Sequence, residues 1–568
     1  MKKKKLVLFT LLCIPVFSLT ACSDFFDMFY FFGIDPTKNA NGGYQSISTP
    51  PAGDDTPHYA PNEYTYDTYI KNNCYPLSAT PATGTANILV IPIWFSDSSQ
   101  CITITNREQV RQDIQKAYFG SNDDTGWRSV KTYYEEESHG KLTITGKVSD
   151  WFECGQSSTK YAIDDDTDSG GNVPKTRSLL DKAITWYFNN NPSDNRKNYD
   201  CDGDGYIDGL MLIYAAPDYQ AWNNNNYTNL WAYCYWIQDK TVKDKNNPGV
   251  NAFFWASYDY MYGSSVAKSR TGSSFSNGDT AHAHIDAHTY IHEMGHMFGL
   301  MDYYDYTRQY NPSGDFSMQD ANLGGHDPFS SFALGWGQAY VPTESTTIDL
   351  KPFATSGELI VLKPKADEYS YSPFDEYLVL EYYTPTGLNE FDCTHKYMST
   401  ENKNYPIGSK TPGIRLWHVD ARLVYPRTLS GGRYIYDKNN VVRDPSYVNT
   451  YGVTLMMSNT YYKSAADDDY ISPLGRDYSD YNLLQLIRNS TTDTYRIPAK
   501  SSGGSFSSGS LFTYGDVFTM EKYNKQFVNY TAKDGKVVGL FNTNEELPFS
   551  FEVNACKQEY ASITITKI

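Results

Sequence analysis

The stretch His292-Glu293-Met294-Gly295-His296-Met297-Phe298-Gly299-Leu300-Met301-Asp302 decides how this chain is interpreted. Residues i and i+4 of a helix share one face, so a helix here would aim the imidazoles of His292 and His296 at one ion. Glu293 stands beside the first histidine, where it can take a proton from a metal-bound water. Gly299 permits a left-handed exit that turns the next residues back toward the histidines. The pattern predicts a zinc site built on a helix.

The residues after the helix constrain the choice of the third zinc ligand. A catalytic zinc ion takes three protein ligands and keeps one position open for water. Between Met294 and Glu344 there is no glutamate, so a downstream glutamate ligand of the thermolysin kind is not expected. Asp302 stands six residues after His296, where the three-histidine enzymes of the metzincin class place their last ligand, and we prefer it. The alternatives are Asp305, Asp315, Asp320 and His326, of which Asp305 fits a loop-capping role better.

Other residues near the motif fit supporting roles. His288 and His292 form a competing i, i+4 pair, but Thr289 follows His288, so this pair has no adjacent base. We expect His288 to support the site or line its rim, and His282 and His284 to face solvent. Met318 follows Asp302 by sixteen residues, in a position that suits the methionine turn which forms an apolar floor beneath the zinc of metzincins.

A second candidate metal site lies at Asp200-Cys-Asp-Gly-Asp-Gly-Tyr-Ile-Asp208. Its carboxylates occupy positions 1, 3, 5 and 9 of an EF-hand loop, with glycine at position 6. Position 12 is Met211 instead of the usual glutamate, and a strand is expected to follow. The spacing predicts a structural calcium loop held by Asp200, Asp202, Asp204 and Asp208. The alternative is an acidic turn without an ion.

The chain begins like a bacterial lipoprotein. A basic segment at 2–5 and an apolar segment at 6–17 precede Leu19-Thr20-Ala21-Cys22, which reads as a lipobox. We expect a signal peptide at 1–21, lipidation of Cys22 and attachment to the outer membrane. Asp24 and Asp27 resemble a surface-export signal of some Gram-negative lipoproteins and favour exposure at the cell surface.

The composition of the chain limits the classes of binding partner that we expect. The net charge is −18 and no cluster of Lys and Arg follows the signal peptide, so nucleic-acid binding is not expected. The 50 tyrosines fit a β-rich protein better than a carbohydrate-stacking surface. An odd number of cysteines follows Cys22, which leaves at least one without an intramolecular partner. Cys74 could act as a latency thiol on zinc, but a disulfide, for instance with Cys101, is the favoured alternative.

The elements expected before residue 341 alternate between strands and helices and predict an α+β fold. A twisted mixed sheet would carry the active-site helix in a metzincin-like catalytic domain. We place a tether or pre-catalytic segment at 22–86, with packed residues near 64–69, and the catalytic domain at 87–341. The expected strands are 87–95, 141–151 and 210–215, and the expected helices are 106–118, 127–137, 176–188 and 286–298.

The remaining segment, 342–568, reads as a β-rich C-terminal region, sandwich-like in character. Its expected strands are 347–350, 358–363, 377–383, 413–419 and 549–553. A Ser/Gly stretch at 501–510 predicts a flexible loop or a seam between subdomains.

These motifs together resemble the immune inhibitor A family of secreted bacterial metallopeptidases. The motifs that carry the resemblance are the strand at 88–97, Ser129–Leu142, the acidic run from Asp200, the zinc motif, Leu334–Trp336, Glu376–Glu381 and Gly413–Asp420. The resemblance implies a zinc endopeptidase with His292, His296 and Asp302 as ligands, Glu293 as base and a calcium-stabilised catalytic domain. Met301 departs from the proline of many relatives. His418 and Asp420 belong to one of these motifs, and we expect structural hydrogen bonding from them.

We therefore expect a lipid-anchored extracytoplasmic zinc metalloendopeptidase that acts on protein or peptide substrates. The alternative is a surface adhesin or glycan-binding protein built on a peptidase-like domain. Loss of catalysis normally damages a ligand or the base, and all four positions are intact here. A glycoside hydrolase would need a pair of acids that the sequence does not identify.

Overall fold

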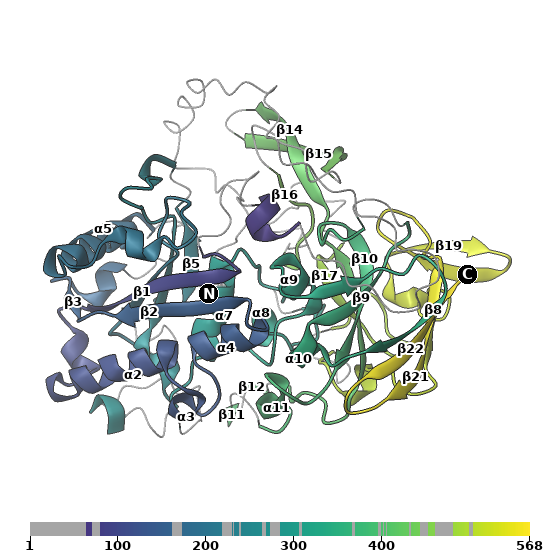
Figure 1. Ribbon diagram of the computed structural model, residues 1–568, viewed down its shortest axis with the longest axis horizontal. Coiled ribbons are helices and arrows are strands. Elements are labelled where there is room, and N and C mark those ends of the chain that lie inside the picture. Colours follow the sequence, from purple (N-terminus) through teal and green to yellow (C-terminus); the bar gives the residue numbers. More distant parts are fainter. Residues whose placement is uncertain are drawn as a thin grey trace, which may run out of the picture.

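The computed structural model describes residues 64–70, 80–161, 173–217, 230, 232–237, 240–263, 269–272, 284–305, 309–365, 370–395, 399–400, 403–404, 406–430, 433–442, 453–460, 481–498 and 504–568. The expected signal peptide, Cys22, Cys74 and His282 lie outside these residues. Figure 1 shows an α/β part and a β-rich part side by side, with helices α7 (His288–Met297) and α8 (Met318–Ala321) between them.

The described residues of the α/β part form a six-stranded mixed sheet, in which β2, β1, β4, β6 and β5 follow one another and β3 extends the pairing of β1. β1 pairs in parallel with β2, β3 and β4, whereas β5 runs antiparallel to β6 at the edge. The expected mixed sheet is confirmed, and its first strand starts three residues earlier than expected. The strands are β1 (Gly84–Trp94), β2 (Leu142–Val148), β3 (Phe152–Glu153), β4 (Gly209–Tyr214), β5 (Tyr233–Trp236) and β6 (Ala252–Ser257).

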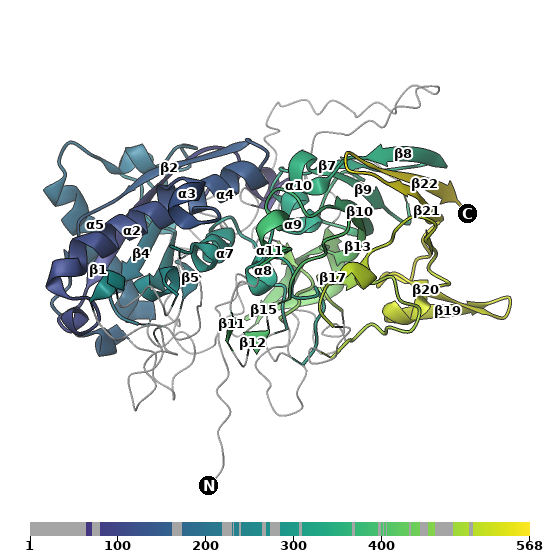
Figure 2. The ribbon, with the colours of Figure 1, turned by 90° about the horizontal axis from the view of Figure 1, so that it is seen from below.

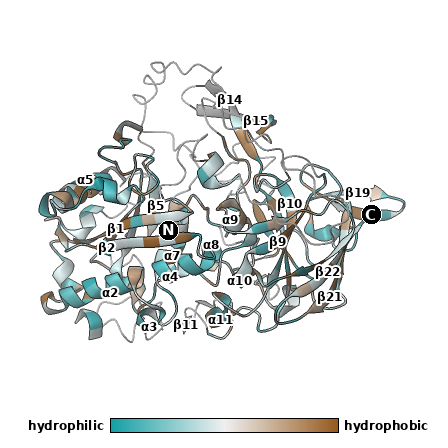
Figure 3. Ribbon diagram, viewed as in Figure 1, coloured by the Kyte–Doolittle hydropathy of each residue, from teal (hydrophilic) through white to brown (hydrophobic). Residues whose placement is uncertain are grey.

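Both faces of this sheet are covered, which explains why β1 is apolar at consecutive positions rather than at alternate ones. Ile88 and Val90 belong to one core with residues of α2, α4 and α7, and Leu89 and Ile91 belong to another with α5. Figure 3 shows α2 mostly in hydrophilic colours, as expected of a helix that exposes one side. The helices are α2 (Arg107–Phe119), α3 (Asn122–Thr125), α4 (Val130–Glu137) and α5 (Val173–Asn190).

The β-rich part contains two sheets that enclose a core of their own. One sheet has the order β17-β13-β10-β9-β7 and the other has the order β18-β21-β22-β8. Side chains alternate along β10: Leu378 and Leu380 enter the core between the sheets, whereas Tyr377 and Val379 face the core shared with the α/β part. The sandwich-like expectation is therefore met. The strands are β7 (Gln338–Tyr340), β8 (Thr346–Leu350), β9 (Glu358–Leu362), β10 (Glu376–Tyr383), β13 (Gly413–Asp420), β17 (Leu484–Ile487), β18 (Val517–Phe518), β21 (Phe549–Cys556) and β22 (Ala561–Lys567).

The remaining α-helices and strands complete the described fold. The hairpin of β19 and β20 projects at the far end of the β-rich part (Figures 1 and 2). These elements are α9 (Pro328–Ala333), α10 (Phe353–Ser356), α11 (Asn389–Asp392), β11 (Ser399–Thr400), β12 (Lys403–Asn404), β14 (Leu423–Ser430), β15 (Arg433–Val442), β16 (Thr454–Leu455), β19 (Asn529–Lys533) and β20 (Lys536–Leu540). Within the described residues, none of the helices has the length and apolar character that crossing a membrane requires.

The two parts share one hydrophobic core. That core contains residues on both sides of position 341, among them Met294 of α7, Trp417 of β13 and Leu486 of β17. The segment before β1 joins it, because Tyr66 packs edge-on against Phe374 with ring centroids 5.4 Å apart. In the Ser/Gly stretch, Gly504 and Phe506 are buried, and the Phe506 N–H donates to the Gly314 carbonyl. The division at 341 remains a prediction, and the contacts across it are extensive.

Candidate metal centre and active site

Helix α7 carries the motif and ends where the sequence predicts. Gly299 has φ of 100°, and the Leu300 N–H donates to the Gly295 carbonyl at 3.2 Å, which closes the helix end. The chain then turns back, so that Asp302 faces the two histidines. A residue with a side chain at position 299 would be strained in this conformation.

His292, His296 and Asp302 bring three ligand atoms together, and all three residues are buried. Asp302 Oδ1 lies 3.0 Å from His292 Nε2 and 3.3 Å from His296 Nε2. Ligands about 2.0–2.1 Å from a tetrahedral zinc ion lie about 3.3 Å from one another. The spacing of these atoms, two imidazole nitrogens and one carboxylate oxygen, therefore fits zinc.

Backbone carbonyls fix which nitrogen of each histidine faces this point. His292 Nδ1 lies 2.7 Å from the Met318 carbonyl, and His296 Nδ1 lies 2.8 Å from the Leu300 carbonyl. A carbonyl accepts only, so each Nδ1 carries the proton and each Nε2 is left for a metal ion. Met318, the expected floor of the site, is fully buried and contributes its backbone oxygen to the orientation of His292.

The charges of the three groups are mutually dependent. Burial lowers the pKa of His296, but the Asp302 carboxylate outweighs this effect and the pKa rises to about 9. Burial would likewise raise the pKa of Asp302, but His296 and His292 hold it far below its usual range. The cluster thus joins the Asp302 anion to the His296 imidazole, which favours the cationic form, and a metal dication can take the place of its proton.

Glu293 sits beside this cluster on α7 and is also buried. Burial raises the pKa of its carboxyl, against the lowering effect of the two histidines and of a hydrogen bond from the Cys234 backbone. Its Oε2 has no hydrogen-bond partner among the described residues. A buried carboxyl with a free oxygen and a raised pKa is suited to accept and return a proton.

The other acidic residues considered as third ligands serve the loop itself. Asp305 Oδ2 accepts from the backbone of Gln309 at 3.0 Å and of Tyr310 at 3.1 Å. Asp320 Oδ2 accepts from the Ser313 hydroxyl at 2.5 Å and the Asp315 backbone at 2.9 Å. Asp315 accepts from Asn311 and Ser505. Within the described residues, Asp302 is the carboxylate that joins the two histidines.

His326 and His288 are buried but lie apart from the three ligand atoms. His326 packs against Tyr133, Tyr134 and Trp336. Burial lowers the pKa of His326, and the nearby His292 and His296 lower it further, to about 3. The His326 ring therefore stays neutral. His288 stacks on Trp127 with centroids 4.0 Å apart.

The His288 ring lies between two carboxylates. Its Nδ1 is 2.7 Å from Asp286 Oδ1, and its Nε2 is 3.6 Å from Asp392 Oδ2 of α11. Burial lowers the pKa of His288, but Asp286 and then Asp392 outweigh it and raise the pKa to about 9. His288 therefore supports the start of α7, whereas His284 is exposed.

Gln319 is a contact that the sequence did not reveal. A Cβ at Gly295 would stand 2.2 Å from Gln319 Oε1, so the glycine inside the motif makes room for this buried side chain. Gln319 Nε2 lies 3.4 Å from His296 Nδ1. The adjacent Met318 and Gln319 thus both contact the histidines, and no spacing rule links them to the helix in advance.

The acidic loop has a different character. Its carboxylates from Asp200, Asp202 and Asp208 lie close enough together to share an ion, whereas Asp204 Oδ1 accepts from the Tyr206 backbone at 2.8 Å. Asp208 is buried and accepts from the backbone of Cys201 and Asn87. Burial raises its pKa to about 7. As expected, a strand, β4, follows the loop.

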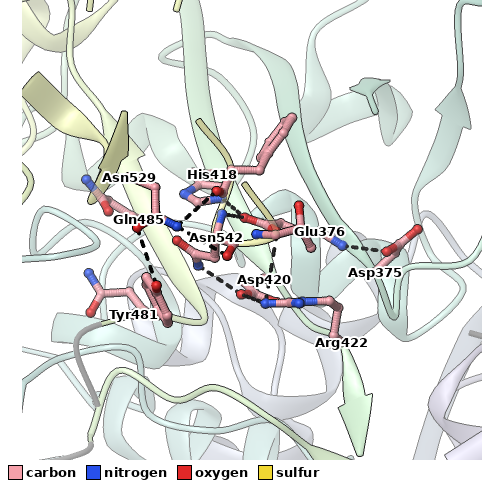
Figure 4. A network of polar contacts seen from close by, with 12 residues as sticks. Asp375, Glu376, His418, Asp420, Arg422, Tyr481, Gln485, Asn529 and Asn542 are labelled. Atoms are coloured by element: carbon pink, nitrogen blue, oxygen red, sulfur yellow. Dashed lines mark hydrogen bonds and ion pairs between the residues drawn. The ribbon is translucent and has the colours of Figure 1, made fainter. Parts of the chain in front are cut away.

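His418 and Asp420 belong to a buried polar network in the β-rich part (Figure 4). His418 Nε2 lies 2.9 Å from Glu376 Oε1, and Arg422 binds Asp420 through two nitrogens at 2.7 and 2.8 Å. Asn542 Nδ2 donates to Asp420 Oδ2 at 2.8 Å. These contacts fit the structural hydrogen bonding that the sequence led us to expect.

Comparison with known proteins agrees with this geometry. The family model of the immune inhibitor A peptidase M6 catalytic domain matches residues 79–323. Pre-pro-metalloprotease PrtV of Vibrio cholerae serotype O1 (strain M66-2) is 26% identical over 252 residues, which cover 38% of this chain and 24% of that relative. Immune inhibitor A of Bacillus thuringiensis subsp. alesti is 25% identical over 204 residues, which cover 33% of this chain and 27% of the relative. The matches thus span about a quarter of the length of these curated relatives, and they confirm the resemblance inferred from the motifs.

Proposed function

We propose that this chain, whose residues 79–323 belong to the immune inhibitor A family of M6 peptidases, is a zinc metalloendopeptidase that hydrolyses peptide bonds of protein substrates. The observation that carries the proposal is the convergence of His292 Nε2, His296 Nε2 and Asp302 Oδ1 in a buried cluster beside Glu293. The names of the relatives, a metalloprotease and an immune inhibitor A, support the same activity.

We assign His292, His296 and Asp302 as the residues that hold zinc. When bound, zinc would acidify a water molecule and polarise the scissile carbonyl. The Met318 and Leu300 carbonyls keep both Nε2 atoms directed at the metal position. Because Asp302 supplies a negative charge, we expect a less acidic water than with three neutral histidines.

Glu293 acts as the general base and then as the general acid. Its Oε2, which accepts no hydrogen bond from the residues that the structure describes, takes a proton from the attacking water, and the protonated carboxyl delivers that proton to the leaving amine. The water oxygen first bonds to the carbonyl carbon, and the bond between that carbon and the amide nitrogen then breaks as the nitrogen receives the proton. The raised pKa of Glu293 favours uptake of the proton from the water, because the protonated form is less costly in a buried site.

The test is Glu293→Gln, measured for zinc content and for digestion of casein. The variant should keep the metal, because Glu293 is not one of the three ligands, and should lose at least about a hundredfold in activity. Glu135→Gln, on α4, serves as a control and should match the parent. Casein digestion that a chelator abolishes is expected of the parent. A parent that binds zinc yet cleaves no protein would favour the adhesin or glycan-binding alternative.

We further propose that the loop at 200–208 binds calcium. Asp200, Asp202 and Asp208 are close together, and Asp200 Oδ1 is a buried oxygen that has no hydrogen-bond partner within the described part of the chain. Carboxylate oxygens in this arrangement suit a hard cation such as Ca²⁺. Isothermal titration with CaCl₂ should show binding that Asp200→Asn removes, and a flat titration of the parent would leave an acidic turn.

For the location, we propose an outer-membrane lipoprotein anchored through Cys22 and exposed outside the cytoplasm. The lipobox at residues 19–22 supports it. Metabolic labelling with a radioactive fatty acid should mark the parent, and Cys22→Ser should abolish the label and release the protein from the membrane fraction. Labelling that persists in the variant would refute lipidation at this residue.

A further inference from the structure

The loop after α7 depends on the β-rich part for its shape. This ligand loop, defined as residues 299–305 and 309–326, carries Asp302 and Met318. Side chains and backbone of the C-terminal region bind its backbone at points that are distant in sequence. These contacts include Asn459 Nδ2 to the Tyr303 carbonyl at 2.7 Å, Arg488 to the Asn311 carbonyl at 3.0 Å, the Leu486 N–H to the Pro312 carbonyl at 2.8 Å, Arg415 to the Phe316 carbonyl at 3.3 Å, and the Gly324 N–H to Asp392 at 2.7 Å.

Tyr303 is the member of this set closest to a zinc ligand, because it comes directly after Asp302. Its N–H donates to the Gln319 carbonyl at 2.9 Å. Its carbonyl accepts from the Ser313 hydroxyl at 2.8 Å and from Asn459 Nδ2 at 2.7 Å. Since peptide units are planar, hydrogen bonds on both sides of Tyr303 fix the planes that flank it and restrict the position of the Asp302 backbone.

Asn459 is held in one orientation. Its side chain is buried, its Nδ2 also donates to the Leu484 carbonyl at 2.8 Å, and its Oδ1 accepts from the Leu484 N–H at 3.1 Å. Because the Leu484 N–H can only donate, the amide oxygen must face it and the amide nitrogen must face the two carbonyls. An amide is thus matched to this position. A carboxylate would set an acceptor against two carbonyl oxygens.

We propose that Asn459, in the C-terminal region, is a positioning residue of the zinc site that fixes Asp302 through the Tyr303 carbonyl. The inference rests on the proposed function, because it assigns Asp302 as a zinc ligand. Asn459 acts through the backbone of the ligand loop. The C-terminal region accordingly helps to position the ligands of the metal site and is not an independent module.

The experiment uses the full chain with Asn459→Asp, which keeps the size of the side chain and removes both donors. A matched control is Asn529→Asp, because Asn529 Nδ2 also donates to two backbone carbonyls, those of Phe541 and Asn542, in the same region. Zinc affinity is measured by competition with a chromophoric chelator, well below the melting temperature of each variant. Substitution of residues that orient metal ligands without binding the metal typically lowers metal affinity by about 10–100-fold. We expect a loss of this size in Asn459→Asp and none in Asn529→Asp.

A second variant, Asn459→Ser, removes the same donors without introducing a charge and decides the matter if Asn459→Asp does not fold. It too should bind zinc at least about tenfold more weakly than the parent. Hydrogen exchange of the peptide that spans residues 299–305 should be faster in either variant. Zinc affinity equal to the parent in a folded Asn459 variant, or an equal loss in Asn529→Asp, would overturn the proposal. A parent chain that binds no zinc would instead refute the proposed function.

Discussion

The two candidate metal sites differ in how their charges are balanced without a cation. In the first, Asp302 lies within 3.3 Å of two imidazoles that can carry protons, so the buried anion has partners. In the second, Asp200, Asp202 and Asp208 face backbone N–H groups and one another. The pKa values report the contrast, since that of Asp302 falls far below its usual range whereas that of Asp208 rises to about 7.

This contrast indicates which of the two sites is organised before an ion binds. His292 and His296 are each oriented by a backbone carbonyl, and the ligand loop is fixed from the C-terminal region. A zinc ion entering this cluster meets ligands that need little rearrangement. In the acidic loop, backbone N–H groups bind the carboxylates of Asp200, Asp202 and Asp208, and a cation that pairs with these carboxylates would add stability. The zinc site should therefore be sensitive to loss of a ligand, and the acidic loop to loss of the cation.

The largest effect expected is on zinc binding. Asp302→Ala removes the anion that faces both imidazoles and should weaken zinc affinity by more than about a hundredfold. This loss exceeds the range that is typical when a residue that only orients a metal ligand is substituted. Asp305→Ala is the matched control, because Asp305 binds the backbone of Gln309 and Tyr310 instead. Metal titration of both variants measures the difference. The reverse order of affinities would move the third ligand from Asp302 to Asp305.

Local sequence patterns predicted several features of the same two sites. The helix followed from the i, i+4 histidines, the approach of Asp302 to these histidines from its offset, and the clustered carboxylates of the acidic loop from its alternating aspartates, because each pattern is local. The α+β sheet and the β-rich sandwich followed from apolar patterning for the same reason.

The supporting contacts could not be foreseen. Met318 orients His292 through a backbone oxygen that any residue possesses, and Gln319 is recognised only once Gly295 is seen to make room for it. Asn459 lies 156 positions from Tyr303, and no periodicity relates the two. Nor did patterning indicate that β10 would be buried on both faces between two cores. Such features depend on tertiary packing, which a single sequence does not encode as a local signal.

An intermediate effect is expected from His288 as pH rises. Its pKa is about 9 in the folded protein against 6.5 as the ordinary value, so folding favours the charged ring. That stabilisation is fully present below about pH 6.5 and is lost as pH rises through about 9. The shift corresponds to roughly 3 kcal/mol in the free energy of unfolding. Urea denaturation of the zinc-saturated protein from pH 6 to 10 measures it.

The control for His288 is His288→Asn, which can retain a hydrogen bond to Asp286 and cannot gain a proton. Its free energy of unfolding should be lower than that of the parent at pH 6 and should depend less on pH above 7. Parallel curves for the two proteins would show that the buried ring carries no charge, and that the carboxylates of Asp286 and Asp392 are balanced otherwise.

The smallest effect concerns the acidic loop and its dependence on pH. Burial raises the pKa of Asp208 to about 7, so without a cation its contribution to stability is present below about pH 4 and is lost as pH rises through about 7. Calcium would offset that loss by pairing with the ionised carboxylates, and at ten times its dissociation constant it would contribute about 1.4 kcal/mol.

The melting temperature should therefore rise with CaCl₂ more at pH 8 than at pH 5, relative to NaCl of the same ionic strength. Asp200→Asn should reduce this response, whereas Asp123→Asn, on the exposed surface of α3, should keep it. An equal response at both pH values would mean that Asp208 is ionised throughout, and the contrast between the two sites would then lie in their geometry rather than in their charge.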